Sequence, residues 1–162
     1  MKYLFLALSS FLAIVAQMIA GNNFVLFNFL DLSLLLVAYW AIYRSRIQAL
    51  FVGSLTGLLL DAALGWPLGY NGFGKTVAAF VIGQSWKKFN TAGQPWVRFT
   101  ILFAASCLSS LSLYLLFWLM QRSSNPVFPG ASVLQALITA GLGIILFAVL
   151  ETYKRIQTNK AH

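Results

Sequence analysis

The sequence predicts an all-α integral membrane protein that folds as a compact bundle of about six transmembrane helices. Of its 162 residues, 60% are apolar and only 9% are charged, whereas soluble domains contain about 25% charged residues. A soluble fold of this composition could not cover its surface with polar side chains, so lipid is the expected solvent. The apolar runs are long and continuous, whereas strands of a membrane barrel alternate in polarity over about ten residues. Helices are therefore expected.

The first two predicted helices are each justified by one feature. A secretory signal would be cleaved after small residues, but Met18 and Ile19 precede Ala20, so the first segment is expected to be a permanent helix. The second begins either near residue 24 or near Asp31, which can cap a helix that starts at Leu32. About 20 apolar residues cross the hydrocarbon core. The single domain, residues 1–162, therefore contains predicted helices at 3–20, 24–43, 47–64, 73–86, 99–120 and 131–150, followed by a basic tail at 151–162.

The last four helices follow from apolar length and from small residues. The fourth is short and has Lys75 near its start, so five spans with a re-entrant fourth segment is the alternative. Serines in the fifth helix and glycines in the sixth permit close helix contact. Tryptophans near the predicted helix ends are typical of membrane interfaces; they are Trp66, Trp86, Trp96 and Trp118.

The basic residues predict the orientation in the membrane. With six crossings, one side receives Arg122, with Lys75 at a helix edge, and the other side receives Lys2, Arg44, Arg46, Lys87, Lys88, Arg98, Lys154, Arg155 and Lys160. Cytoplasmic loops carry the excess of Lys and Arg. Both termini and the loops near 44–46 and 87–98 are therefore expected in the cytoplasm.

The same pattern narrows the possible functions. Nucleic-acid binding needs a basic patch on an ordered soluble face, and these cations are scattered over loops and the tail, where anionic lipid is the expected partner. Cys107 and His162 are the only residues of their types, so no disulfide, metal cluster, cofactor or catalytic triad is expected.

Residues 69–76 match a phosphate-binding loop in sequence, with Gly69, Gly74, Lys75 and Thr76 at the required spacing. A working loop of that kind follows a β-strand and opens a helix in an α/β domain. Here the preceding segment is a predicted membrane helix, and the loop would lie outside the cytoplasm. No nucleotide is therefore expected, and the glycines predict a tight turn between two helices.

A stripe of small residues marks one face of the third helix. Gly53, Gly57, Asp61 and Gly65 recur every four residues, which keeps them on one side of a helix. Such a face allows close packing against another helix or a partner protein. With Pro67 and Gly69 of the following turn, these residues form the candidate packing face.

Asp61 is a functional candidate because a carboxylate inside a membrane segment is costly unless it is paired or hydrated. In an antiparallel hairpin its depth coincides with that of Lys75, so an Asp61–Lys75 ion pair is one hypothesis. A partner-binding carboxylate and an aspartate simply hydrated at the interface are the others.

The segments "LDLSLLLVAYWAIYRSR" and "GSLTGLLLDAALGWPLGYNGFGKT" resemble the MreD family of rod shape-determining proteins of the bacterial inner membrane. The shared pattern is G-x-x-x-G-x-x-x-D followed by G-x-P-L-G, here Gly53, Gly57 and Asp61, then Gly65 to Gly69. The family often has Pro-Asp where this chain has Leu30-Asp31.

The resemblance implies a non-catalytic scaffold of the cell-elongation machinery, which helps to determine rod shape and to organise peptidoglycan synthesis. The implied partners are an MreC-like rod-shape protein, the peptidoglycan polymerase and transpeptidase, and the actin-like MreB on the cytoplasmic side. The family fold is also similar to the substrate-binding subunit of energy-coupling-factor vitamin transporters. A transporter subunit, with Asp31, Asp61, Asn71 and Lys75 around an outward-facing pocket, is therefore the alternative. An intramembrane enzyme would lack a nucleophile and base.

Overall fold

The computed structural model describes residues 2–23, 30–88, 94–120 and 129–160. In these ranges the chain forms helices and no strands. They are α1 (Lys2–Asn23), α2 (Leu32–Tyr43), α3 (Arg46–Leu64), α4 (Tyr70–Lys88), α5 (Pro95–Leu119) and α6 (Pro129–Lys160).

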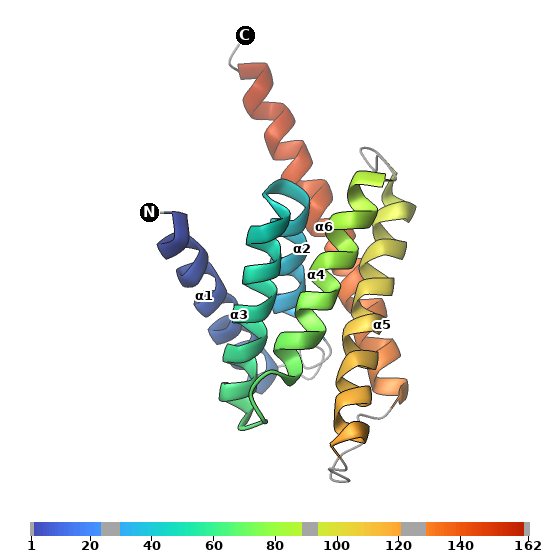
Figure 1. Ribbon diagram of the computed structural model, residues 1–162. Coiled ribbons are helices and arrows are strands. Elements are labelled where there is room, and N and C mark those ends of the chain that lie inside the picture. The colour runs from blue at the N-terminus through green and yellow to red at the C-terminus, as the bar shows by residue number, and fades with distance from the viewer. Residues whose placement is uncertain (1, 24–29, 89–93, 121–128, 161–162) are drawn as a thin grey trace.

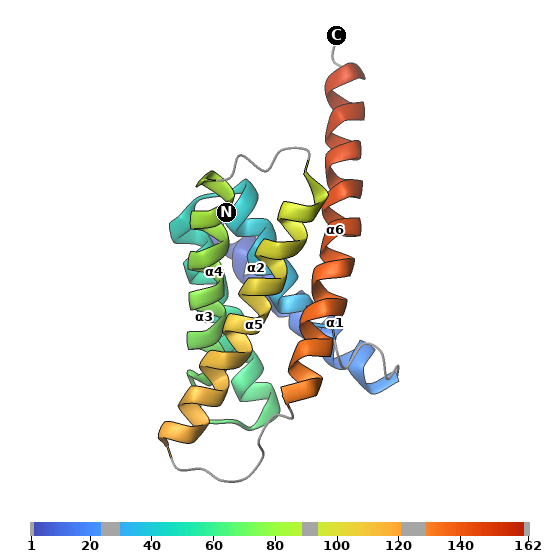
Figure 2. The same cartoon turned by 90° about the vertical axis from the view of Figure 1, so that its right-hand side faces the viewer.

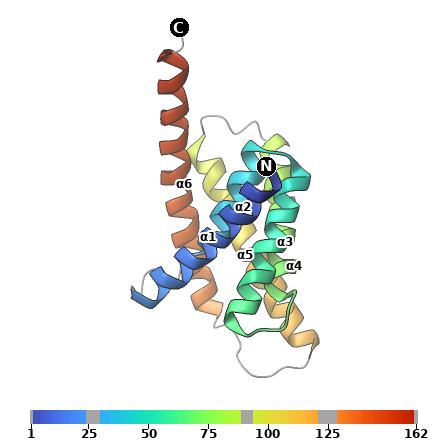
Figure 3. The same ribbon diagram turned by 90° about the vertical axis from the view of Figure 1, so that its left-hand side faces the viewer.

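The helices form a bundle in which α3, α4, α5 and α6 run alternately up and down, each packed against the next (Figure 1). The short helix α2 lies in the middle and contacts α1, α3, α4 and α6. Helix α1 crosses α2 and α3 obliquely (Figure 3). Both termini lie toward the end of the bundle where α2 turns into α3 (Figure 1). The α3–α4 turn lies at the opposite end.

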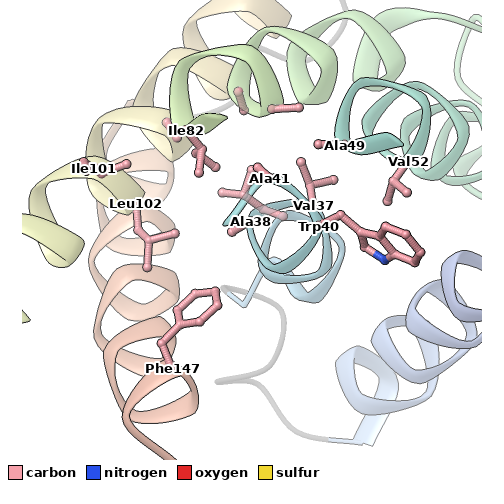
Figure 4. Packing of buried hydrophobic residues seen from close by; sticks show 14 of the residues in the cluster. Val37, Ala38, Trp40, Ala41, Ala49, Val52, Ile82, Ile101, Leu102 and Phe147 are labelled. Atoms are coloured by element: carbon pink, nitrogen blue, oxygen red, sulfur yellow. The ribbon is translucent and has the colours of Figure 1, made fainter. Parts of the chain in front are cut away.

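The apolar core surrounds α2. Its side chains Val37 and Trp40 are buried. Val52 of α3 lies on the Trp40 side of α2, and Leu102 of α5 and Phe147 of α6 lie on the opposite side (Figure 4). Alanines fill the closest approaches, because a small side chain lets two helix backbones come together. They are Ala38, Ala41, Ala49, Ala78, Ala79, Ala105 and Ala140.

Local sequence signals set several helix ends. Asp31 caps α2 through its side chain, as predicted. At α3, the Ser45 side chain accepts a hydrogen bond from Gln48 N, and the Gln48 side chain accepts one from Ser45 N, which is a capping box. Gly65 ends α3 in the left-handed conformation, with φ of 66°. Pro95 is the first residue of α5, where its missing N–H leaves no hydrogen bond unmade.

Several predicted boundaries are wrong. The fourth and fifth helices begin at Tyr70 and Pro95 and not at residues 73 and 99. The second helix does not begin at residue 24, because residues 30 and 31 are non-helical and Asp31 caps the helix; the shorter alternative is the observed one. Residues 24–29 lie outside the described ranges. The sixth helix does not end at residue 150 but continues to Lys160, because no glycine or proline follows Gly143 to stop it. Its last turns run past the rest of the bundle (Figure 2).

Among the described residues, three helices are long and apolar enough to cross a membrane: α3 over Arg46–Leu64, α5 over Trp96–Leu119 and α6 over Gly130–Leu150. Large apolar side chains are exposed on the outside of the bundle, among them Leu12, Leu115 and Ile145. Lipid is the natural cover for such a surface, so the fold fits the predicted class of membrane protein.

Candidate functional site

The glycine face of α3 packs directly against α4. A Cβ atom added to Gly53 would lie 2.8 Å from the carbonyl oxygen of Lys75, and one added to Gly57 would lie 2.3 Å from Cα of Gly72. No side chain fits at that separation. The α4 backbone lies directly against α3 because Gly53 and Gly57 have no side chain, and at Gly57 the facing residue, Gly72, has none either. The part of the candidate packing face formed by Gly53 and Gly57 therefore serves contact within the chain.

The end of the same face forms the α3–α4 turn. Gly65 and Gly69 have positive φ values of 66° and 105°, and Pro67 lies between them. A Cβ atom at either glycine would meet no atom within 4 Å. Glycine is therefore required at these two positions because of the positive φ value, and not because a side chain would clash.

Asp61 binds the N-terminal end of α4. Its carboxylate accepts hydrogen bonds from Gly69 N at 2.9 Å, from Asn71 N at 3.0 and 3.1 Å, from Asn71 Nδ2 at 2.8 Å and from Gly72 N at 3.4 Å. Its side chain is fully buried. The first N–H groups of a helix have no partner inside the helix and carry partial positive charge. Asp61 is therefore a cap supplied to α4 by the preceding helix.

The predicted Asp61–Lys75 ion pair is wrong. Lys75 Nζ instead lies 2.6 Å from Asp31 Oδ2. Depth in the hairpin was the basis of the prediction, but depth does not determine the side of α4 from which a residue projects. Lys75 extends toward α2, whereas the N–H groups at the start of α4 face α3 and bind Asp61.

Asp31 organises a second buried polar group, which we call the Asp31 cluster: Gln17, Asp31, Ser33, Lys75 and Thr139. Asp31 Oδ1 accepts hydrogen bonds from Leu34 N at 2.9 Å and from Ser33 Oγ at 2.6 Å. Asp31 N donates to Thr139 Oγ1 at 3.1 Å, and Ser33 N donates to Gln17 Oε1 at 3.2 Å. The cluster thus joins α1, the start of α2, α4 and α6.

Three members of this cluster were not predicted from the sequence. Gln17 and Thr139 are polar residues inside apolar helices, and Ser33 follows Asp31 by two residues, where a hydroxyl can join a helix cap. Polar residues within membrane helices usually face the bundle interior and find partners there. This rule could have identified the three residues as buried polar groups, but it could not have predicted which side chains contact one another.

The phosphate-loop pattern at residues 69–76 has its binding groups occupied by the chain itself. The N–H groups of Gly69 and Gly72 point to the Asp61 carboxylate, which stands where a phosphate would be bound. Lys75 binds Asp31, and Thr76 Oγ1 donates to Gly72 O at 2.7 Å. The preceding element is helix α3 and not a strand. This geometry serves helix packing and offers no phosphate site.

The described residues include no group of three His, Cys, Asp or Glu side chains that could hold a metal ion. The Asp31 cluster therefore contains one ion pair with neutral hydrogen-bond partners. The second buried polar group is the Asp61 carboxylate, which caps α4.

Comparison with known proteins gives a family match. No curated protein matches the chain, and no solved structure does, so the similarity to the transporter subunit is unsupported. The family described as rod shape-determining protein MreD matches residues 1–153, which is nearly the whole chain. This match agrees with the resemblance carried by Gly53, Gly57, Asp61 and Pro67. The chain therefore belongs to the MreD family, and its role lies in determining rod shape.

Proposed function

We propose that the chain is a non-catalytic scaffold of the bacterial inner membrane that organises peptidoglycan synthesis during cell elongation through protein–protein contacts. The proposed partners are an MreC-like rod-shape protein, the peptidoglycan polymerase and transpeptidase, and, on the cytoplasmic side, the actin-like MreB. The termini and the connections near residues 44–46 and 87–98 would face the cytoplasm, since they carry most of the Lys and Arg.

The observation that supports the proposal is that the buried charged side chains hold helices together. Asp31, Asp61 and Lys75 bind one another or backbone groups. The Asp31–Lys75 ion pair joins α2 to α4, and the bonds from Asn71 to Asp61 join α4 to α3. Polar groups that fix helix positions make a rigid body, whereas a transport or catalytic site needs polar groups directed to a substrate. The outer surface, with its exposed apolar side chains, is then what other membrane proteins can contact.

The alternative, a transporter subunit, has less support. It would require Asp31, Asp61, Asn71 and Lys75 to line a pocket that opens outside. In the structure Asn71 donates to Asp61 and Lys75 binds Asp31, and all four residues are buried. The family match also refers to cell shape and not to transport.

Co-purification from mild detergent tests the proposal. Affinity-tagged chain expressed at its natural level should recover the MreC-like protein and peptidoglycan-synthesis enzymes, as quantified by mass spectrometry. An unrelated multi-pass protein of similar size, tagged in the same way, is the control and should recover neither. Recovery of a vitamin or an energy-coupling ATPase module in their place would contradict the scaffold.

Photo-crosslinking can then locate the contact face. A crosslinking residue at exposed Leu115 of α5 or Ile145 of α6 lies on the outside of the bundle, whereas one at buried Ala136 is a matched internal control. If the scaffold acts through its outer surface, at least one exposed position should yield a product with a partner protein, and Ala136 should not. Products with lipid alone, from all exposed positions of the bundle, would contradict a role through protein contacts.

A further inference from the structure

The positive charge of this chain exceeds what its own carboxylates can neutralise. The sequence contains 11 Lys and Arg against 3 Asp and Glu. Lys75 is paired with Asp31, and Asp61 is bound to the start of α4. Ten cations therefore remain against one acidic residue outside these contacts, Glu151, so most of their counter-ions must come from outside the chain.

Two of these cations lie together at the corner where α2 turns into α3. Arg44 and Arg46 are exposed, and within the described part of the chain neither forms an ion pair. The Arg44 guanidinium lies 5.8 Å from the centre of the Trp40 ring, a cation–π contact that orients it. Both guanidinium groups thus remain available to an external anion.

The end of α4 adds to this corner. A Cβ atom added to Gly83 would lie 3.7 Å from Arg46 Cγ, so the Arg46 stem rests on α4 one turn before Lys87. We define the basic corner as Arg44 and Arg46, of which Arg46 lies beside the α4 backbone at Gly83.

The surroundings of the corner match a phospholipid better than a soluble anion. Exposed apolar side chains lie within two turns of the cations: Ile47 is 80% exposed, Phe51 58% and Phe80 60%. Trp86, which is half-buried, lies in the last turn of α4, and aromatics near helix ends are typical of membrane interfaces. Cations above apolar side chains reproduce the order of headgroup phosphate above acyl chains. Guanidinium groups bind phosphate oxygens with two hydrogen bonds.

We propose that the basic corner binds the phosphate of an anionic phospholipid headgroup and so fixes this end of the bundle to the membrane surface. The lipid supplies the negative charge that the chain lacks, while its acyl chains cover the apolar side chains beside the corner. A zwitterionic lipid offers the same phosphate with a compensating cation, so it should bind more weakly.

Lipid retention by the purified full chain tests this proposal. Native mass spectrometry from mild detergent should show phosphatidylglycerol bound in preference to phosphatidylcholine with the same acyl chains. Each cation near an anionic surface strengthens binding by roughly fivefold, so the double variant Arg44→Gln, Arg46→Gln should bind phosphatidylglycerol about 25-fold more weakly. Its binding of phosphatidylcholine should change little.

A matched control distinguishes a site from diffuse charge. Lys154→Gln with Arg155→Gln removes the same charge from the part of α6 that projects beyond the bundle, and phosphatidylglycerol binding should stay near that of the wild type. Equal losses of phosphatidylglycerol binding in the two double variants, or no loss in either, would contradict a lipid site at the basic corner. Competition by millimolar inorganic phosphate as effective as that by lipid would overturn the phospholipid assignment. If the double variant does not fold, Arg44→Lys with Arg46→Lys and the single Arg46→Gln give the same test with charge retained or halved.

Discussion

Lys75 Nζ lies 2.6 Å from Asp31 Oδ2, and the two residues come from α4 and from the residue that caps α2. Both side chains are almost completely buried. The Asp31 carboxylate therefore caps α2 through Oδ1, and through Oδ2 it neutralises a buried lysine and joins α2 to α4. Because α2 lies in the middle of the bundle, this ion pair fixes the position of the helix around which the core is built.

Breaking this pair should destabilise the protein strongly. Lys75→Met leaves the Asp31 carboxylate buried without its counter-charge, which typically costs about 3–5 kcal/mol. Asp31→Asn retains a capping side chain but leaves Lys75 unpaired. In the double variant the two losses should not add, with a coupling of about 1–3 kcal/mol, measured as thermal stability in detergent micelles.

The same cycle built on Asp61→Asn and Lys75→Met is the matched control. Asp61 binds N–H groups and not Lys75, so the coupling in this cycle should be the smaller of the two. A larger coupling for Asp61 than for Asp31 would restore the ion pair expected from the sequence.

Removing the Asp61 carboxylate should loosen the start of α4. Asp61→Ala leaves the N–H groups of Asn71 and Gly72 without their acceptor, and loss of a cap together with buried unpaired donors should cost at least about 2 kcal/mol. Hydrogen exchange at these two amides should accelerate. Asp61→Asn keeps one oxygen acceptor and should give an intermediate effect; unchanged exchange in Asp61→Ala would show that this cap is dispensable.

The contact between α3 and α4 should not tolerate a single methyl group. Gly57→Ala places a Cβ atom 2.3 Å from Gly72 Cα, so the helices must separate, at a cost of about 1–3 kcal/mol or more. Gly141→Ala in α6 is the matched control, since a Cβ atom there meets nothing within 4 Å. Its replacement should be neutral or stabilise by up to about 1 kcal/mol. Similar thermal stabilities for the two variants would contradict the packing described here.

The α3–α4 turn should be sensitive to backbone conformation and not to volume. Gly65→Ala and Gly69→Ala force an alanine into positive φ, which costs about 1–2 kcal/mol each although space is available. Gly130→Ala, also in open space but at the start of α6, should be close to neutral. Gly65→Asn should recover part of the loss, because asparagine adopts the left-handed conformation more readily. Thermal stability of the four variants decides the point; equal losses at Gly65 and Gly130 would contradict it.

Much of this architecture could be predicted from the sequence because the signals are local. Apolar length predicted the helical membrane class, Asp31 predicted a cap, and Gly65, Pro67 and Gly69 predicted the turn between α3 and α4. Each of these depends on residues within one or two turns, whose preferences hold wherever the segment lies. The resemblance to the MreD family likewise depends on a short run of residues around Asp61.

The tertiary structure alone decided which buried groups meet. Asp61 and Lys75 lie at similar depths on adjacent helices, yet Asp61 binds the backbone of α4 and Lys75 reaches Asp31. Gln17 and Thr139, from the first and last helices, complete the Asp31 cluster. The partner of a buried charge depends on the rotation of each helix about its axis and on which helices are neighbours. These are set by the packing of the whole bundle around α2, to which the alanine and glycine contacts contribute, and no local pattern specifies them.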